Sequence, residues 1–240
     1  MSKIFVGCSG WSYWYWRKIF YPEDLPRYRW LKYYSEKFNT VEVNSTFYRL
    51  PSERMVKDWV KKTPDGFKFT VKAPKEVTHI RKFENVREVL NKFYRITDML
   101  GEKLACILYQ LPPSISLDMN FLNKMLSEID CSKCSVIEFR DESWFNDEVY
   151  SKLKEKNIAF CSVSSSKLPE EIVKTSNFIY IRFHGKKGGH RYFYSEGELK
   201  EWAEKIKKSK ANMVYCYFNN DYQGNAVKNA LALKKILENY

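Results

Sequence analysis

The feature that most constrains the fold is a repeat of short apolar runs separated by helical segments. Residues that are β-branched or aromatic gather in eight runs, IFVGCSG, TVEVNSTF, KFTVKAP, ACILYQLP, SVIEFR, IAFCSVSS, FIYIRFHG and MVYCYFNN, which begin near residues 4, 40, 68, 105, 135, 158, 178 and 213. Apolar residues at helical spacing lie between most of these runs. The segment SSKLPEEIVKTSN, between the sixth and seventh runs, has room for only a short helix.

Eight strands that alternate with helices in a chain of 240 residues predict an α/β fold of the closed (β/α)8 type, the TIM barrel. No Ser-, Gly- or Pro-rich linker divides the sequence, so we expect residues 1–240 to form a single domain. An open, doubly wound sheet is the alternative.

Composition limits location and partners. No apolar stretch approaches the roughly 18 to 20 residues that span a bilayer, and the N-terminus lacks a signal-peptide pattern, so we expect a cytoplasmic protein without a membrane partner. The six cysteines lie in apolar segments, which indicates reduced, buried thiols. The net charge of +12 favours anionic partners. Solvated helix faces account for many lysines equally well. The sequence does not indicate an oligomeric state.

Polar residues follow the apolar part of most strands, and the functional groups of a TIM barrel lie at these C-terminal strand ends. Side chains two apart in a strand share a face, so Glu138 should project with Arg140, and Arg182 with His184. Glu42 and Glu138 are the candidate general acid and base, with His184 as a third candidate catalytic residue. The candidate substrate-binding residues are Trp11, Tyr13, Asn44, Lys72, Gln110, Arg140, Arg182 and Asn219.

The charges in this set predict the ligand class. Two carboxylates face three fixed cations, and a buried cation without a partner is costly. We therefore expect an enzyme that binds a small anionic molecule bearing phosphate or carboxylate, which arginine grips through its planar fork. Hydrolysis and isomerisation both stay open, since the sequence does not give the distance between the carboxylates. A network of ion pairs with only a structural role is the alternative.

The stretch GWSYWYWRKIFYP, residues 10–22, crowds aromatic rings beside Arg17 and Lys18. In a barrel this stretch is the loop after the first strand and lies over the strand ends. It can pack as a lid, or its rings can stack on a base or sugar. The second function class is therefore a barrel that binds or processes nucleic acid, using the aromatic loop at residues 11–21 and the basic surface.

No metal centre is predicted and no cofactor is required by the sequence. The chain has only three histidines, too few for a trinuclear zinc site. One Mg²⁺ or Mn²⁺ ion on Glu42 and Glu138 stays open, because hard cations accept carboxylate oxygens. The glycine-rich segment GKKGGHRYFY, residues 185–194, predicts either a solvated loop or an anion clamp built from Lys186, Lys187 and Arg191.

Seven blocks of the sequence also carry a family resemblance. GCSGWSYWYWRKIFYP, TVEVNSTFYRLPS, TPDGFKFTVKAPKEVTHI, ILYQLPPS, EFRDESWF, IRFHG followed by RYFY, and YFNNDYQGNAVKNA resemble, in order, the blocks of the YecE-like family, domain of unknown function 72. The resemblance implies a TIM-barrel-like fold, which has been compared with sugar-isomerase-like and endonuclease-like barrels. One block departs from the family: Asp141 and Glu142 stand where the family usually has His and Pro.

Overall fold

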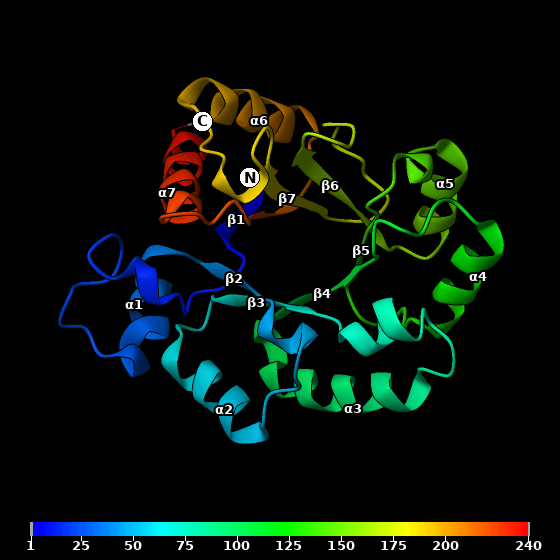
Figure 1. Ribbon diagram of the computed structural model, residues 1–240, viewed down its shortest axis with the longest axis horizontal. Coiled ribbons are helices and arrows are strands. Elements are labelled where there is room, and N and C mark those ends of the chain that lie inside the picture. The colour runs from blue at the N-terminus through cyan, green and yellow to red at the C-terminus, as the bar shows by residue number, and fades with distance from the viewer. Residues whose placement is uncertain (1, 240) are drawn as a thin grey trace.

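The computed structural model describes residues 2–239, and within them eight parallel strands surround one axis with helices outside (Figure 1). The strands are β1 (Lys3–Cys8), β2 (Thr40–Val43), β3 (Lys68–Lys72), β4 (Leu104–Gln110), β5 (Ser135–Glu138), β6 (Ala159–Ser165), β7 (Ile179–Gly185) and β8 (Met213–Phe218). The helices are α1 (Trp30–Lys37), α2 (Glu53–Lys62), α3 (Arg87–Thr97), α4 (Met119–Glu128), α5 (Asp147–Glu155), α6 (Glu196–Lys208) and α7 (Asn225–Glu238). The predicted (β/α)8 barrel is confirmed, and each apolar run contains one strand.

Local side-chain chemistry sets the starts of several helices. In α6 the Ser195 hydroxyl accepts from the Glu198 backbone N–H and the Glu198 carboxylate accepts from the Ser195 N–H, a capping box. Asp118 and Asn146 cap α4 and α5 in a similar way. These caps satisfy backbone donors that the first turn of a helix leaves without partners.

The described residues between β6 and β7 form no helix. Side chains hold this segment against β6 instead: the Phe160 N–H donates to Thr175 Oγ1 at 2.8 Å, and the Val173 N–H donates to Ser162 Oγ at 3.0 Å. The crossover is therefore an extended strap, without room for the short helix that the sequence allowed.

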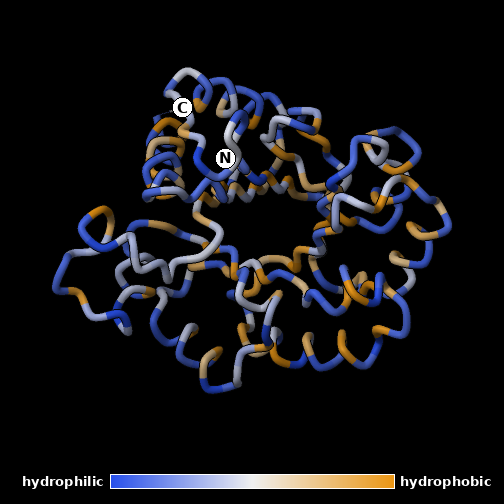
Figure 2. The backbone as a smooth tube through the Cα atoms, in the orientation of Figure 1, coloured by the Kyte–Doolittle hydropathy of each residue, from blue (hydrophilic) through white to orange (hydrophobic). Residues whose placement is uncertain are grey.

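Two apolar cores lie on the two faces of the sheet. The larger packs strands against helices, as Phe183 of β7 does against Trp202 of α6, with ring centroids 5.2 Å apart. The smaller contains strand residues such as Cys106, Tyr180 and Tyr217 and no residue from the seven helices, so it fills the inside of the barrel. Figure 2 shows the resulting pattern, with apolar stretches along the strands and hydrophilic outer turns on the helices.

The barrel closes between β1 and β2 through side chains. The strand order begins at β1 and ends at β2. The Asn39 amide bridges to β1, where Oδ1 accepts from the Val6 N–H at 3.1 Å and Nδ2 donates to the Ile4 carbonyl at 3.0 Å. Gly7 permits this close approach, because a Cβ atom there would lie 2.2 Å from the Thr40 carbonyl oxygen. The sheet is thus a nearly closed barrel with one seam.

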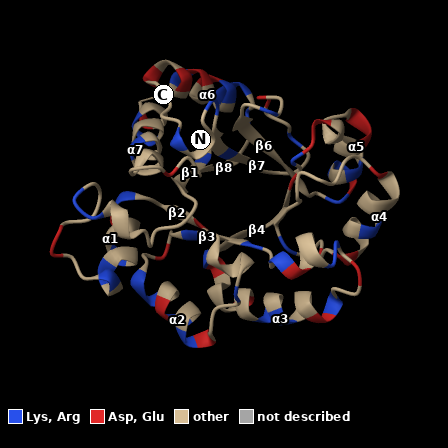
Figure 3. Cartoon of the chain, in the orientation of Figure 1, with Lys and Arg blue, Asp and Glu red and all other residues tan. Residues whose placement is uncertain are grey.

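Charges of both signs alternate on the outer helices (Figure 3), in pairs such as Lys92 with Glu88 and Lys200 with Glu196. Within residues 2–239, no helix combines the length and apolar character needed to cross a membrane. The prediction of six buried thiols is wrong for Cys131 and Cys134, which are exposed because they lie in the turn between α4 and β5.

Candidate functional site

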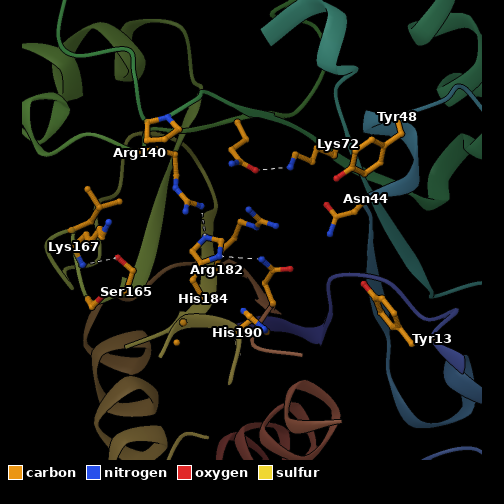
Figure 4. Close-up of a pocket in the computed structure, with 17 residues that line it drawn as sticks. Tyr13, Asn44, Tyr48, Lys72, Arg140, Ser165, Lys167, Arg182, His184 and His190 are labelled. Carbon is orange, nitrogen blue, oxygen red and sulfur yellow. Dashed lines mark hydrogen bonds between the residues drawn. The ribbon is translucent and has the colours of Figure 1, made fainter. Parts of the chain in front are cut away.

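A cavity of about 700 Å³ lies at the C-terminal ends of the strands (Figure 4), a size typical of small-molecule sites. Eight of the residues singled out in the sequence line it: Tyr13, Asn44, Lys72, Gln110, Arg140, Arg182, His184 and Asn219. Lys167 and His190 line it too. The lining therefore holds four Lys or Arg side chains and two histidines, and among the described residues no Asp or Glu.

Strand ends position most of these groups. Lys72 and Gln110 are the last residues of β3 and β4, and Arg182 and His184 share one face of β7. The placement of Arg140 on the fifth strand is wrong: β5 ends at Glu138, and Arg140 lies two residues beyond. Its Nη1 atom nevertheless reaches Glu138 Oε1 at 2.8 Å, so the two side chains meet as expected.

Glu42 and Glu138 lie beneath the cavity floor and are both fully buried. The Arg182 guanidinium stands between them, with Nη2 2.6 Å from Glu42 Oε1 and Nη1 2.5 Å from Glu138 Oε2. The Tyr180 hydroxyl donates to Glu42 Oε2 at 2.5 Å, and the Ser9 hydroxyl donates to Oε1 at 2.7 Å. Because these partners enclose the Glu42 carboxylate, neither of its oxygens is free to contact a ligand in the cavity.

These contacts keep both carboxylates ionised. Burial by itself would raise the pKa of Glu42, but the charge of Arg182 and the hydrogen bond from Tyr180 outweigh it and lower that pKa. Burial opposes ionisation of Glu138 too, and the charges of Arg182 and Arg140, with the hydrogen bond from His184, hold its pKa well below the ordinary value. Glu42 and Glu138 therefore act as fixed negative charges that hold Arg182.

His184 joins the buried charges to the cavity. Its Nε2 lies 2.9 Å from Glu138 Oε1, and its Nδ1 lies 3.2 Å from Asn219 Nδ2. One proton arrangement satisfies both contacts, with Nε2–H donating to Glu138 and Nδ1 accepting from the amide. Burial lowers the pKa of His184 and outweighs the attraction of Glu138, which raises it; the charges of Arg182 and Arg140 add to the lowering. The imidazole is therefore neutral at pH 7.

Lys72 differs from Arg140 and Arg182 in its partners. Its Nζ donates to Gln110 Oε1 at 2.5 Å and lies 4.2 Å from the centre of the Phe47 ring. In the described part of the chain no carboxylate forms an ion pair with it. Burial and the nearby charge of Arg182 lower the pKa of Lys72 from 10.5 to about 8.

The carboxylates do not offer a metal site. Both oxygens of Glu42 and both oxygens of Glu138 already accept hydrogen bonds from protein donors, and the neighbouring cations repel a divalent ion. The described residues also contain no group of three or more His, Cys, Asp or Glu side chains suited to hold a metal. The geometry therefore gives no support to the Mg²⁺ or Mn²⁺ alternative.

Comparison with known proteins assigns the family. A family model described as "protein of unknown function DUF72" matches residues 5–240. The chain belongs to the DUF72 family. A DUF72 protein of Thermotoga maritima is similar with a TM-score of 0.90 and 34% identity, over 98% of this chain and 99% of that one. A DUF72 protein of Enterococcus faecalis has a TM-score of 0.85 and 22% identity, over 98% of this chain and 95% of that one. At this identity the comparison supports the fold alone.

Two curated relatives carry the name UPF0759. The UPF0759 protein YunF of Bacillus subtilis is 26% identical, over 98% of this chain and 95% of its own length. The UPF0759 protein YecE of Escherichia coli is 28% identical over 45% of this chain and 38% of its own. The resemblance to YecE-like proteins is confirmed.

The two residues that depart from the family resemblance, Asp141 and Glu142, lie outside the cavity. Asp141 Oδ1 accepts from the Ser143 backbone N–H at 3.1 Å and so caps a short helical turn, and Glu142 is exposed. Neither residue lines the cavity. The two added carboxylates therefore leave the cationic lining of this DUF72 protein unchanged.

The aromatic loop is only partly packed against the rest of the protein. Trp16 and Tyr21 are buried, and the Trp16 indole N–H donates to the Asp221 carboxylate at 3.0 Å. Trp14 and Tyr15 stay exposed, at 63% and 47%. Tyr13 lines the main cavity. Trp11 does not, because it packs edge-on against Trp59 of α2 with ring centroids 5.5 Å apart.

The loop after β7 departs from the anion clamp that its cations suggested. Lys186 forms ion pairs with Glu170 and Glu198, and the Arg191 guanidinium lies over the Tyr222 ring. The loop after β7 contributes other residues to the cavity lining, above all His190, which the sequence analysis did not select as a binding residue.

Two further residues escaped the sequence analysis. Tyr48 lines the cavity, and Tyr180 binds Glu42 below it. Only Tyr180 carried a usable signal, because it lies two residues before Arg182 on the same face of β7.

Proposed function

We propose that this DUF72 protein is an enzyme whose substrate is a small molecule bearing phosphate or carboxylate, bound in the cavity at the C-terminal ends of the strands. One observation carries the proposal: the described lining contains four Lys or Arg side chains and no carboxylate. Such a lining in a concave site attracts an anion and repels a cation.

The buried acids neutralise only part of this charge. Glu42 and Glu138 both pair with Arg182, and Glu138 also pairs with Arg140. Within residues 2–239, the contacts of Lys72 are with the neutral side chains of Gln110 and Phe47. An anion beside Lys72 and Arg140 would balance the remaining positive charge, and the Arg140 side chain is 31% exposed and thus reachable.

The same contacts suggest roles in catalysis. Lys72, with a pKa of about 8, can hold or release a proton near neutral pH, which suits a general acid or base. Arg140 and Arg182 would stabilise negative charge as it develops on a substrate. Glu42 and Glu138 become positioning residues for Arg182 rather than the acid and base. This arrangement suits hydrolysis or isomerisation of an anionic substrate.

The test is binding of ribose 5-phosphate, measured by calorimetry and thermal shift. We expect Lys72→Met and Arg140→Met each to weaken binding at least about tenfold, as loss of one charge-assisted contact does. Lys92→Met is the matched control, because Lys92 is an exposed lysine on α3 paired with Glu88. Equal affinity in all four proteins, or no binding of ribose 5-phosphate or inorganic phosphate by the parent chain, would overturn the proposal.

Nucleic acid is a second candidate ligand, favoured by one observation. Trp14 is 63% exposed, and the Arg17 guanidinium lies 4.9 Å from the centre of its ring, a pairing that can stack on a base. The Asp221 carboxylate, bound by the Tyr15 hydroxyl in the same loop, opposes a phosphate backbone there. We therefore rank this candidate below the small anionic substrate.

A further inference from the structure

A second cavity, of about 480 Å³, adjoins the cationic one. Tyr13, Asn44 and Tyr48 border both cavities, so the two spaces meet along these three side chains. Figure 4 shows all three on the same side of the main cavity, opposite Arg140 and Lys167.

The chemistry of the second cavity contrasts with that of the first. Its walls include Trp11, Tyr48, Met55 and Trp59, and Arg27 is its single charged residue among those described. The Arg27 guanidinium is turned to Ser12, with Nε 3.1 Å from Oγ. Aromatic faces and a thioether of this kind bind flat rings well.

The walls formed by Trp11, Trp59 and Tyr13 are held in place before any ligand arrives, whereas Tyr48 is exposed. Trp11 meets Trp59 at an interplanar angle of 87°, and the Trp11 carbonyl accepts from the Tyr21 hydroxyl at 2.5 Å. The Tyr13 hydroxyl donates to the Ser9 carbonyl at 2.5 Å. A ring that enters thus meets rigid surfaces, which reduces the entropy lost on binding.

The boundary between the cavities holds a polar atom without a partner. Asn44 Nδ2 donates to the Ser9 carbonyl at 3.4 Å, while Asn44 Oδ1 is buried and has no hydrogen-bond partner among the described residues. An unsatisfied buried acceptor is costly. A ligand that spans both cavities passes this oxygen and can donate an N–H or O–H group to it.

We propose that the two cavities form one bipartite site, in which the substrate's anionic group lies near Lys72 and Arg140 and a flat ring joined to it lies between Trp11 and Tyr48. The inference rests on the proposed function, because it extends the same anion site. It assigns a substrate class: phosphate or carboxylate esters and conjugates that carry an aromatic or heterocyclic ring, of which nucleoside monophosphates are one example.

The experiment compares two probes, adenosine 5′-monophosphate and ribose 5-phosphate, of which only the first carries the flat adenine ring. Stacking contributes enough that the ring-bearing probe should bind roughly 5- to 150-fold more tightly. Tyr48→Ala and Trp11→Ala should each reduce this ratio, because they weaken binding of the ring-bearing probe more than binding of ribose 5-phosphate. Tyr48 is 81% exposed, so its variant should fold even if Trp11→Ala does not. Phe193→Ala, at an exposed ring that borders neither cavity, is the control.

The outcomes separate the two proposals. Tight ring-dependent binding that Tyr48→Ala weakens and Phe193→Ala does not supports the bipartite site. Equal binding of the two probes overturns it and leaves the anion site standing. If the ratio of the two affinities is unchanged in Tyr48→Ala and Trp11→Ala, the bipartite site is also overturned, because the adenine ring then binds elsewhere. Failure of both probes to bind overturns the anion site as well.

Discussion

Arg182 Nη2 and Glu42 Oε1 meet 2.6 Å apart with neither side chain more than 2% exposed, so the barrel holds a buried ion pair under its cavity. Removing one partner of such a pair leaves a charge without compensation in a poorly solvated place. The pair therefore links the stability of the barrel to the geometry of the site.

We expect Glu42→Leu to lower the free energy of unfolding by about 3–5 kcal/mol, measured by urea denaturation. Glu88→Ala, which breaks the exposed pair with Lys92, should lower it far less, because solvent screens an exposed ion pair. If Glu42→Leu costs no more than Glu88→Ala, the buried pair does not stabilise the fold as described.

Anion affinity should depend on pH through Lys72. The ammonium form attracts the ligand and is lost as the pH rises through about 8. The second pKa of a phosphate ester is about 6, so the charge of ribose 5-phosphate is constant above that range. Calorimetry from pH 7.5 to 9.5 should show affinity falling by up to about tenfold per pH unit above pH 8. Lys72→Arg, which keeps its charge, should give a flat profile, whereas a parallel decline in both proteins would assign the titration to another group.

Stability should change in the opposite direction over this range. The unfolded chain keeps the Lys72 proton up to about pH 10.5 and the folded chain only to about 8, so the unfolded state binds more protons between these values. The contribution of Lys72 to the free energy of unfolding therefore rises with pH in this window. Urea denaturation should show the parent chain gaining stability relative to Lys72→Met between pH 7 and pH 10. A difference that stays constant would contradict the lowered pKa.

The seam between β1 and β2 should be a weak point of the barrel. Asn39→Ala leaves the Val6 N–H and the Ile4 carbonyl without the partners they now have, at a cost of about 1–3 kcal/mol for each buried group. Hydrogen exchange should accelerate at the Val6 amide before it does in β7. Asn123→Ala, at an exposed position on α4, should change neither quantity. Unchanged exchange at Val6 would mean that the seam closes by other contacts.

The nucleic-acid candidate makes its own prediction about salt. Binding along a phosphate backbone weakens steeply as salt rises, because each neutralised phosphate releases counterions. We expect a single-stranded oligonucleotide to bind weakly at low salt, to dissociate near physiological salt, and to be indifferent to Trp14→Ala. Salt-resistant binding that Trp14→Ala abolishes would favour nucleic acid over a small substrate.

The alternation of strand and helix was readable in the sequence because it depends on local apolar spacing. All eight strands lie where these runs occur, and the capping box of Ser195 with Glu198 is likewise local, because it is set by residues three apart. The gathering of polar groups at the strand ends was also readable, since parallel strands in a barrel all point the same way.

Which charged side chains pair with each other in the site could not be predicted from local spacing. From the sequence, Glu42, Glu138, Lys72 and Arg182 could be recognised as charged residues in or near the ends of strands. The spacing of two residues between Tyr180 and Arg182 in β7 also indicates that they share a face. Only the closed barrel brought Glu42 within reach of Arg182, 140 positions along the chain, and left Lys72 with neutral partners. Which acid meets which base depends on distances across the barrel, and these exist only once the sheet has closed.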